Sequence, residues 1–244
     1  MNTCSMCLVG LLCGAFVSGV PAATIDVAPI GGGVTLTSGD LSGIAFGGAE
    51  PTWSTSSLAA VNAALNASGI NTDGKITVLA ADTDHGLSLI TLVDRQLSPQ
   101  IPEDTGHLRL DSAGDATSSV FMNNADGTSD TTSTGPGFRL ANADFVWNSN
   151  GAGVGVAWAN LLDGNLMTFR FQAPASGLGL DATNTFQYVT WNGTGWALAP
   201  VSADAASFTE TGEYGFAAMV HVVPAPAGLA LAGLASLALG RRRR

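Results

Sequence analysis

Two carboxylates and a histidine within four residues form the densest group of ligand-type side chains in the sequence. Asp82 and Asp84 alternate in the run Asp82-Thr83-Asp84-His85, and oxygen donors at this spacing could converge on a hard cation such as calcium. The run is not followed by the glycine and the bidentate glutamate of a twelve-residue calcium loop at the required positions. Because Asp side chains also bond their own backbone in turns, we favour turn residues over metal ligands here.

A second group of oxygen donors lies between Asn123 and Asp130 and is equally incomplete as a calcium loop. The same choice between turn and cation site applies to it, and we again favour the turn. We expect no cofactor, with calcium as the open alternative. Its candidate ligands are Asp82, Asp84, Asp126 and Asp130.

Constellations that could catalyse a reaction are scarce. The chain contains no Gly-x-Ser-x-Gly elbow, no His-Glu-x-x-His pair and no glycine-rich phosphate loop. Glu210 and Glu213 could serve as the two carboxylates of a glycosidase, but residues three apart in a strand face opposite ways, which favours a surface turn. His85, His107 and His221 are scattered, and we do not favour a metal site built from them. We therefore expect a protein that is not an enzyme.

Aromatic side chains leave sugar binding open. Several tryptophans on one sheet face could stack on sugar rings, whereas core packing is the alternative that we favour, because large rings carry much of the buried area of a β-sandwich. Trp191 and Trp196 are the expected exceptions, since they flank a hairpin turn predicted at Asn192-Gly193. The five tryptophans are Trp53, Trp147, Trp158, Trp191 and Trp196.

Short runs of β-branched and aromatic residues dominate the middle of the chain. Gly, Asn, Asp and Ser separate them at intervals of about ten residues, the spacing of a sandwich or barrel. The predicted fold class is all-β, a mainly antiparallel, jelly-roll-like β-sandwich. The predicted strands are 76–79, 87–93, 117–122, 145–147, 154–158, 167–171 and 186–191, and the predicted long surface loops are 98–105 and 123–137.

One short helix and a last strand complete the prediction. The helix is expected near 57–67, because Leu58, Val61 and Leu65 recur on one helical face. Ser56 or Ser57 could cap its start, and Gly69 could end it in the left-handed conformation. Residues 214–220 are predicted to form the final strand, which follows a break near Gly212 and leads almost directly into Pro224.

Charge and cysteine content limit the partners and the compartment. All 19 acidic residues lie between Ala23 and Pro224, whereas four of the nine basic residues are at the C-terminus, which leaves this region a net charge of −14. Nucleic acid and anionic membrane surfaces are poor partners for such a domain. All three cysteines precede Gly14, so the remaining chain has no cysteine from which a disulfide could form.

The first 22 residues are interpreted as a secretory signal peptide. An apolar run, Leu8–Val17, is followed by small residues, and Ala22 or Ala23 supplies the cleavage site. We therefore divide the chain into a signal peptide (1–22), one exported domain (23–221) and a C-terminal segment (222–244).

The C-terminal segment has three parts in a fixed order. A short motif, Val223-Pro224-Ala225-Pro226, leads into an apolar run at 227–240, and the chain stops on four arginines. Fourteen helical residues span roughly 21 Å, so this single transmembrane helix would cross the ~30 Å hydrocarbon core only marginally. The arginines place the tail in the cytoplasm and the domain across the membrane. The anchoring leucines are Leu229, Leu231, Leu234, Leu237 and Leu239, and the stop-transfer residues are Arg241, Arg242, Arg243 and Arg244.

These three parts resemble the C-terminal sorting signal of PEP-CTERM proteins, the exosortase substrates of Gram-negative bacteria. The family most often has Glu at the middle motif position, where this chain has Ala225, so a Val-Pro-x-Pro-Ala variant is the better match. The resemblance implies export by the secretion machinery, transient anchoring in the inner membrane and transfer by an exosortase-type enzyme to the cell surface. It also implies a structural or adhesive role among exopolysaccharides or in a biofilm. A plain uncleaved anchor remains the alternative for the tail, and a carbohydrate-binding module or carbohydrate-active enzyme remains the alternative for the domain.

Overall fold

The computed structural model describes residues 22–29, 32–47, 49–94, 106–123, 131–147, 154–172, 186–202 and 216–223. The predicted signal peptide up to residue 21 and everything after Val223 lie outside these residues. In the part of the chain that is described, no helix is both long and apolar enough to cross a membrane.

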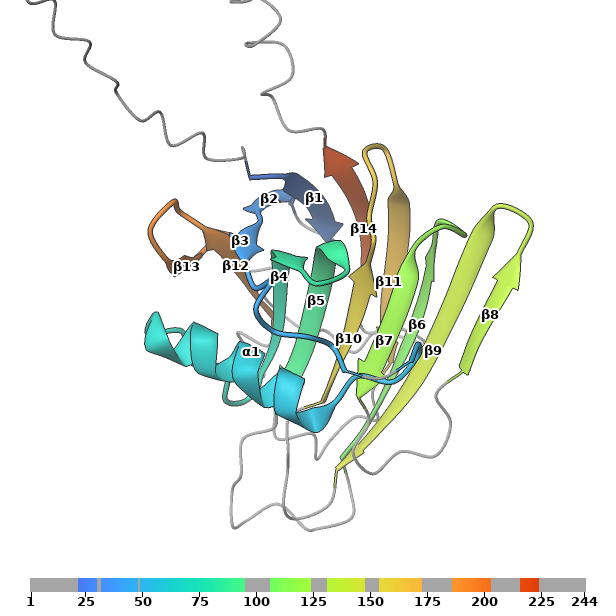
Figure 1. The fold of residues 1–244 in the computed structure, drawn as a ribbon, viewed down its shortest axis with the longest axis horizontal. Helices are drawn as coiled ribbons and strands as arrows, with labels where there is room; N and C mark the ends of the chain where they lie inside the picture. Colours follow the sequence, from blue (N-terminus) through green and yellow to red (C-terminus); the bar gives the residue numbers. More distant parts are fainter. Residues whose placement is uncertain are drawn as a thin grey trace, which may run out of the picture.

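Two β-sheets, an antiparallel one called sheet A and a mixed one called sheet B, form the body of the domain (Figure 1). In sheet A every neighbouring pair of strands is antiparallel. Its strands are, in spatial order, β2 (Val34–Thr37), β1 (Thr24–Pro29), β14 (Phe216–Val223), β11 (Leu166–Gln172), β6 (Gly106–Gly114), β9 (Phe138–Trp147) and β8 (Thr131–Gly135).

Sheet B contains two parallel pairs, β12 with β4 and β3 with β4, among otherwise antiparallel neighbours. Its strands are, in spatial order, β13 (Trp196–Leu198), β12 (Phe186–Trp191), β4 (Lys75–Thr83), β5 (Gly86–Asp94), β10 (Val154–Ala159) and β7 (Ser119–Asn123), with β3 (Gly39–Asp40) beside β4. The all-β prediction is therefore confirmed as a sandwich-like fold, although its pairing is not purely antiparallel.

The main core lies between the two sheets. Buried side chains of sheet A, such as Ile25 and Phe169, belong to the same cluster as Ile76 and Val156 of sheet B. In β11, Met167, Phe169 and Phe171 are buried while Leu166, Thr168 and Arg170 are exposed, as the predicted alternation requires.

A helix covers the other face of sheet B. α1 (Thr55–Ala67) buries Leu58, Val61 and Leu65 against sheet residues such as Leu79 and Ile90, which confirms the predicted helical face (Figure 1). The outer face of sheet A carries no helix among the described residues. The domain is thus layered as sheet A, sheet B and helix.

The helix ends were predicted with mixed success. Its N-cap is Ser54, whose Oγ accepts a hydrogen bond from the Ser57 amide at 3.2 Å, so the prediction of Ser56 or Ser57 as the cap was wrong. The true cap lies earlier because the chain enters the helix from the β7-bonded segment at Thr52 and Trp53. Gly69 has φ +78°, the left-handed conformation predicted for the end of the helix.

All seven predicted strands correspond to strands of the structure. The prediction of an uninterrupted loop at 123–137 was wrong, because Thr131–Gly135 form β8 and pair with β9, where β-sheet hydrogen bonding outweighs the turn-like composition. Strands β1, β2, β3 and β6 were not predicted, and β13 was implied only by the predicted hairpin. The predicted loop at 98–105 lies outside the described residues.

The predicted last strand exists and is longer than expected. β14 runs to Val223 and lies between β1 and β11, so Val222 and Val223, assigned above to the sorting segment, belong to the sheet. Val220 is buried, whereas the side chains of Phe216 and Ala218 and the predicted break near Gly212 lie outside the described part.

Candidate functional site

The first and last described strands pair so that both ends of the domain lie side by side. In the antiparallel register of β1 and β14, Thr24 stands opposite Val223. In Figure 1, β1 and the tip of β14 lie together at the upper end of the domain. We call this end of the domain the exit end. It contains the beginning of β1, the end of β14 and the connection between β10 and β11.

Backbone hydrogen bonds hold the chain at the exit end up to its last strand residues. The Val222 amide donates to the Asn165 carbonyl at 3.1 Å, and the Gly164 amide donates to the Val222 carbonyl at 3.0 Å. On the N-terminal side, the Ser38 amide donates to the Ala23 carbonyl at 2.8 Å. Both the N–H and the C=O of Val222 are therefore hydrogen-bonded within the domain. An enzyme that binds an extended peptide could use free backbone groups only beyond this residue.

The predicted processing residues lie on either side of this register. Ala22 and Ala23 directly precede β1, and Val223, the first residue of the sorting motif, ends β14. Pro224, Ala225 and Pro226, the anchoring leucines and the terminal arginines lie outside the described residues.

A shallow pocket opens on the outer face of sheet A close to the exit end. Its volume is about 440 Å³. Turns and strand ends build it, because β6 ends, β9 and β11 begin, and the connections before β9 and β11 lie here. Its lining residues are Ala113, Gly114, Asp115, Gly137, Phe138, Gly164, Leu166, Met167, Thr168 and Met219.

The carboxylate of this pocket is occupied by its own turn. Asp115 Oδ1 accepts hydrogen bonds from the Thr117 amide at 2.9 Å and the Thr117 hydroxyl at 2.6 Å. These bonds lower the pKa of Asp115 from its ordinary value. A carboxylate whose oxygen is bonded within its own turn is poorly placed to act as a general acid or base.

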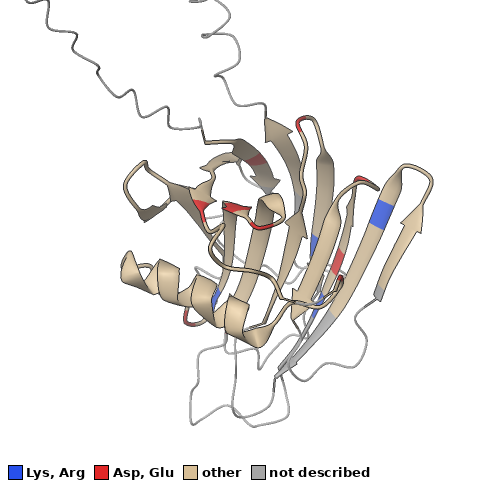
Figure 2. Ribbon diagram, viewed as in Figure 1, with Lys and Arg blue, Asp and Glu red and all other residues tan. Residues whose placement is uncertain are grey.

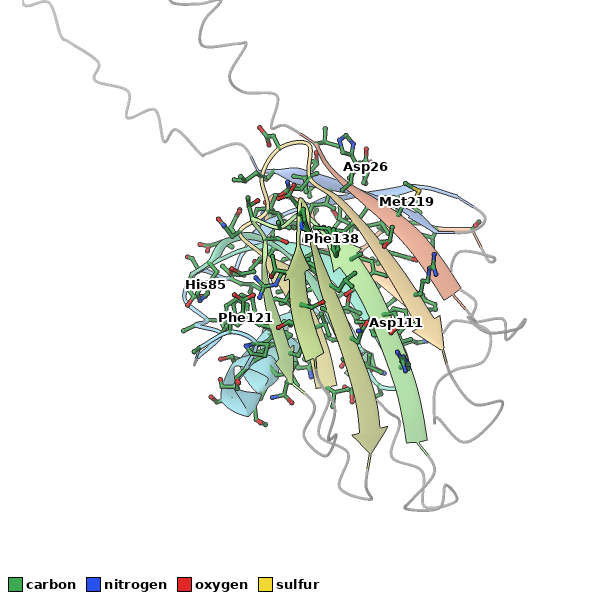
Figure 3. All side chains as sticks on the ribbon, turned by 90° about the vertical axis from the view of Figure 1, so that its right-hand side faces the viewer. Asp26, His85, Asp111, Phe121, Phe138 and Met219 are labelled. Carbon is green, nitrogen blue, oxygen red and sulfur yellow. The ribbon has the colours of Figure 1, made fainter. Side chains whose placement is uncertain are left out.

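Large apolar side chains are exposed around the pocket. Leu166 is 58% exposed, Met219 60% and Phe138 43%, and Leu162, in the neighbouring β10–β11 connection, is 54% exposed. Figure 3 shows Phe138 and Met219 toward the upper end of sheet A, near Asp26, with Asp111 lower down. Sequence reasoning missed this surface because each residue belongs to a different strand or turn, and only the tertiary fold brings them together.

The run Asp82-Thr83-Asp84-His85 covers the end of β4 and the tight turn into β5. Thr83 pairs with Gly86, and Thr83 Oγ1 accepts the His85 amide at 3.2 Å. Asp82 Oδ2 accepts the Ser38 hydroxyl at 2.9 Å, which joins the β2–β3 crossover to β4. These are the roles of turn and strand residues.

The other metal candidates add no site within the described residues. These residues contain no group of three His, Cys, Asp or Glu side chains able to hold a metal ion. Asp126 and Asp130 lie outside them, as do Glu210 and Glu213. His85 packs on Phe121, with ring centroids 4.6 Å apart, and His221 is exposed on β14 of the other sheet, while the side chain of His107 is not described (Figure 3).

The tryptophans pack mostly in the core. Trp53 and Trp158 are buried, as favoured above. Trp196, predicted to be an exposed exception, is only 6% exposed, because β3 passes under the hairpin: a Cβ built on Gly39 would lie 2.5 Å from the Trp196 ring. Trp191 is half-buried against Trp196, with ring centroids 5.4 Å apart. The side chain of Trp147 is not described.

The Asn192-Gly193 hairpin itself is confirmed. Trp191 pairs with Trp196, so four residues form the turn instead of two. Asn192 Oδ1 accepts the amides of Thr194 and Gly195, both at 3.0 Å.

No family model, no curated protein and no solved structure matches the chain.

Proposed function

We propose that the chain is an exported, non-enzymatic protein of the cell surface or extracellular matrix, sorted by an exosortase-type enzyme. The secretion machinery would export it, the apolar run at 227–240 would hold it in the inner membrane, and cleavage near Val223-Pro224-Ala225-Pro226 would release it. Its role would be structural or adhesive, in association with exopolysaccharide.

The observation that carries this proposal is the register of Thr24 opposite Val223. Both terminal segments interpreted as removable join the domain at one end and next to each other, so both could reach the same membrane face while the domain is folded. Because β14 is an inner strand of sheet A, trimming beyond Val223 would leave every strand of the sheet in place. This geometry suits a domain that is processed at both ends without being unfolded.

A non-enzymatic role is consistent with the chemistry of the described residues. The described pocket holds a single carboxylate, and that carboxylate is bonded within its own turn. Three of the four tryptophans whose side chains are described are buried and the fourth is half-buried, so the carbohydrate-binding alternative gains no support from them. A glycan array beside an activity screen on polysaccharides would separate an adhesive role from a carbohydrate-active one.

The sorting proposal is tested by changing the motif in the native host. Replacing Pro224 and Pro226 with Ala should keep the chain in the inner membrane and deplete the cell surface, because an extended processing site would be lost. Ala225→Glu is the matched control, since it places the residue most frequent in the family between the same prolines and should preserve processing. An unchanged distribution of the double variant would refute sorting through this motif.

A further inference from the structure

We propose that the exit end of the domain lies on the surface of a zwitterionic lipid bilayer while the chain is anchored, with Leu162, Phe138 and Leu166 in contact with lipid. This inference rests on the proposed anchoring by residues 227–240. It adds the face of the domain that meets the membrane and the side chains that touch it.

The tether between the sheet and the apolar run is too short to keep the domain away from the bilayer. Val223 is bonded into β14, and the apolar run begins at Ala227. The four Cα-to-Cα steps from Val223 to Ala227, with three residues between, span at most about 14 Å when fully extended. The polar headgroup region on each side of a bilayer is about 5–8 Å thick. The exit end must therefore lie within or just above the headgroups.

The side chains at this end are placed there by the topology of sheet A. β11 begins at Leu166 beside the end of β14, since Leu166 pairs with His221. β6 runs antiparallel to both β11 and β9, so the start of β9 at Phe138 lies at the same end as the start of β11. Leu162 lies in the β10–β11 connection, whose Gly164 is bonded to Val222.

These apolar side chains are exposed, although burying them would stabilise a domain that is surrounded by water. Leu162, Leu166 and Phe138 are each more than two-fifths exposed, and Phe138 lies across Gly135, where even a Cβ would collide with its ring. Apolar side chains at strand ends and turns can insert into the headgroup boundary without disturbing the sheet. Met219 lies four residues before the end of β14, farther from the exit end, and should touch lipid less.

Charge at this end selects the type of lipid. Asp26, Asp115 and Asp163 lie here, and the acidic residues at the strand tips can be followed in Figure 2. Among the described residues, Arg139 is the one lysine or arginine at this end, and its guanidinium is paired with Glu50. An acidic end would be repelled by anionic lipid and tolerated by a zwitterionic surface. The same carboxylates would repel each other in a dimer formed through this face.

The experiment uses residues 23–244 in phosphatidylcholine vesicles, because the apolar run Leu8–Val17 of the predicted signal peptide could bind lipid by itself. This stretch has no cysteine, so a single one is introduced by Leu162→Cys or Leu166→Cys and labelled with an environment-sensitive fluorophore. Asp73→Cys is the control, because Asp73 is exposed in the turn before β4, at the opposite end of the domain. Leu162 and Leu166 are more than half exposed, so these replacements leave the core intact.

We expect the fluorophore at 162 and 166 to shift its emission to the blue and to be quenched by brominated lipid, and the fluorophore at 73 to do neither. If the protein floats with the vesicles but all three positions respond alike, the lipid-facing surface is refuted while the anchor stands. A blue shift at 162 and 166 without vesicles would instead reveal a contact between copies and would also overturn the inference.

A separate arm tests the anchor on which the inference rests. Replacing Leu231, Leu234 and Leu237 with Asp should abolish flotation if the tail holds the chain in the bilayer. Flotation that persists in this variant would refute the tail anchor itself. The two failures are thus distinguishable.

Discussion

Glu50 and Arg139 form an ion pair that joins the two sheets along one side of the sandwich. The Arg139 Nη2 to Glu50 Oε1 distance is 2.6 Å, and the two side chains are 16% and 27% exposed. Arg139 belongs to β9 of sheet A, while Glu50 also accepts the backbone amide of Val120 in β7 of sheet B. On the other side of the sandwich the chain itself passes from sheet A to sheet B between β2 and β3.

Breaking this pair should destabilise the domain. We expect Glu50→Gln to lower the free energy of unfolding by about 1–3 kcal/mol, since a largely buried guanidinium loses its counter-charge. Arg109→Gln is the control, because the Arg109–Asp111 pair is on the surface and should contribute less than about 1 kcal/mol. Urea unfolding measures both, and equal effects would contradict the role of Glu50.

Gly39 should not tolerate a side chain. A Cβ at this position would lie 2.5 and 2.6 Å from two carbons of the Trp196 ring. We expect Gly39→Ala to cost about 1–3 kcal/mol through overpacking and to alter tryptophan fluorescence. Gly43→Ala, where a Cβ would meet nothing within 4 Å, is the matched control. A Gly39→Ala protein that melts with the wild type would show that β3 does not pack under the hairpin.

Asp94 should make stability depend on pH. Burial raises its pKa above the ordinary value, although a hydrogen bond from the Thr72 hydroxyl at 2.8 Å opposes the shift. The charged form is then less favourable in the folded state, so stability is greatest below the unfolded pKa and falls as the pH rises through the folded pKa. We expect Asp94→Asn to raise the melting temperature at neutral pH.

The gain from Asp94→Asn should vanish near pH 3, at about or below the unfolded pKa, where the wild-type carboxyl is largely protonated in both states. Asp163→Asn, at an exposed position, is the matched control for the chemical change itself. Melting curves across this pH range decide it. A loss of stability of the same size at both ends of the range would indicate that Asp94 acts through packing rather than through its charge.

The end of β14 should be part of the folded domain. Val222 is fully buried in the core between the sheets, so Val222→Asp should cost about 3–5 kcal/mol through lost packing and a buried charge. Met219→Asp, on the exposed face of the same strand, should stay within about 0.5 kcal/mol of the wild type. Similar unfolding of both variants would place the domain boundary before β14.

The buried strands could be predicted because their own residues are apolar and often β-branched. β4, β5 and β10 carry continuous buried runs, and β11 alternates cleanly. β8 could not, because Thr131–Gly135 has the residues of a loop and becomes a strand only by pairing with β9. β1 and β2 are short; β1 is held in the sheet by β14, which is remote in sequence, and β2 is the edge strand that pairs with β1.

The candidate site divides in the same way. Processing residues at both ends are a prediction from local sequence patterns, whereas the register that brings Thr24 opposite Val223 is a tertiary property. The burial of Trp196 depends on β3, which arrives from more than 150 residues earlier in the chain. The exposed apolar surface around Phe138 and Met219 is likewise assembled from separate strands.

Intact mass spectrometry of the surface-exposed protein, recovered from the native host, tests the central proposal most directly. Sorting and release predict a main species that lacks Met1–Ala22 and the segment after Val223-Pro224-Ala225-Pro226, with β1 and β14 both retained. A main surface species that still carries Arg241–Arg244 would contradict it and would leave the tail as a simple membrane anchor.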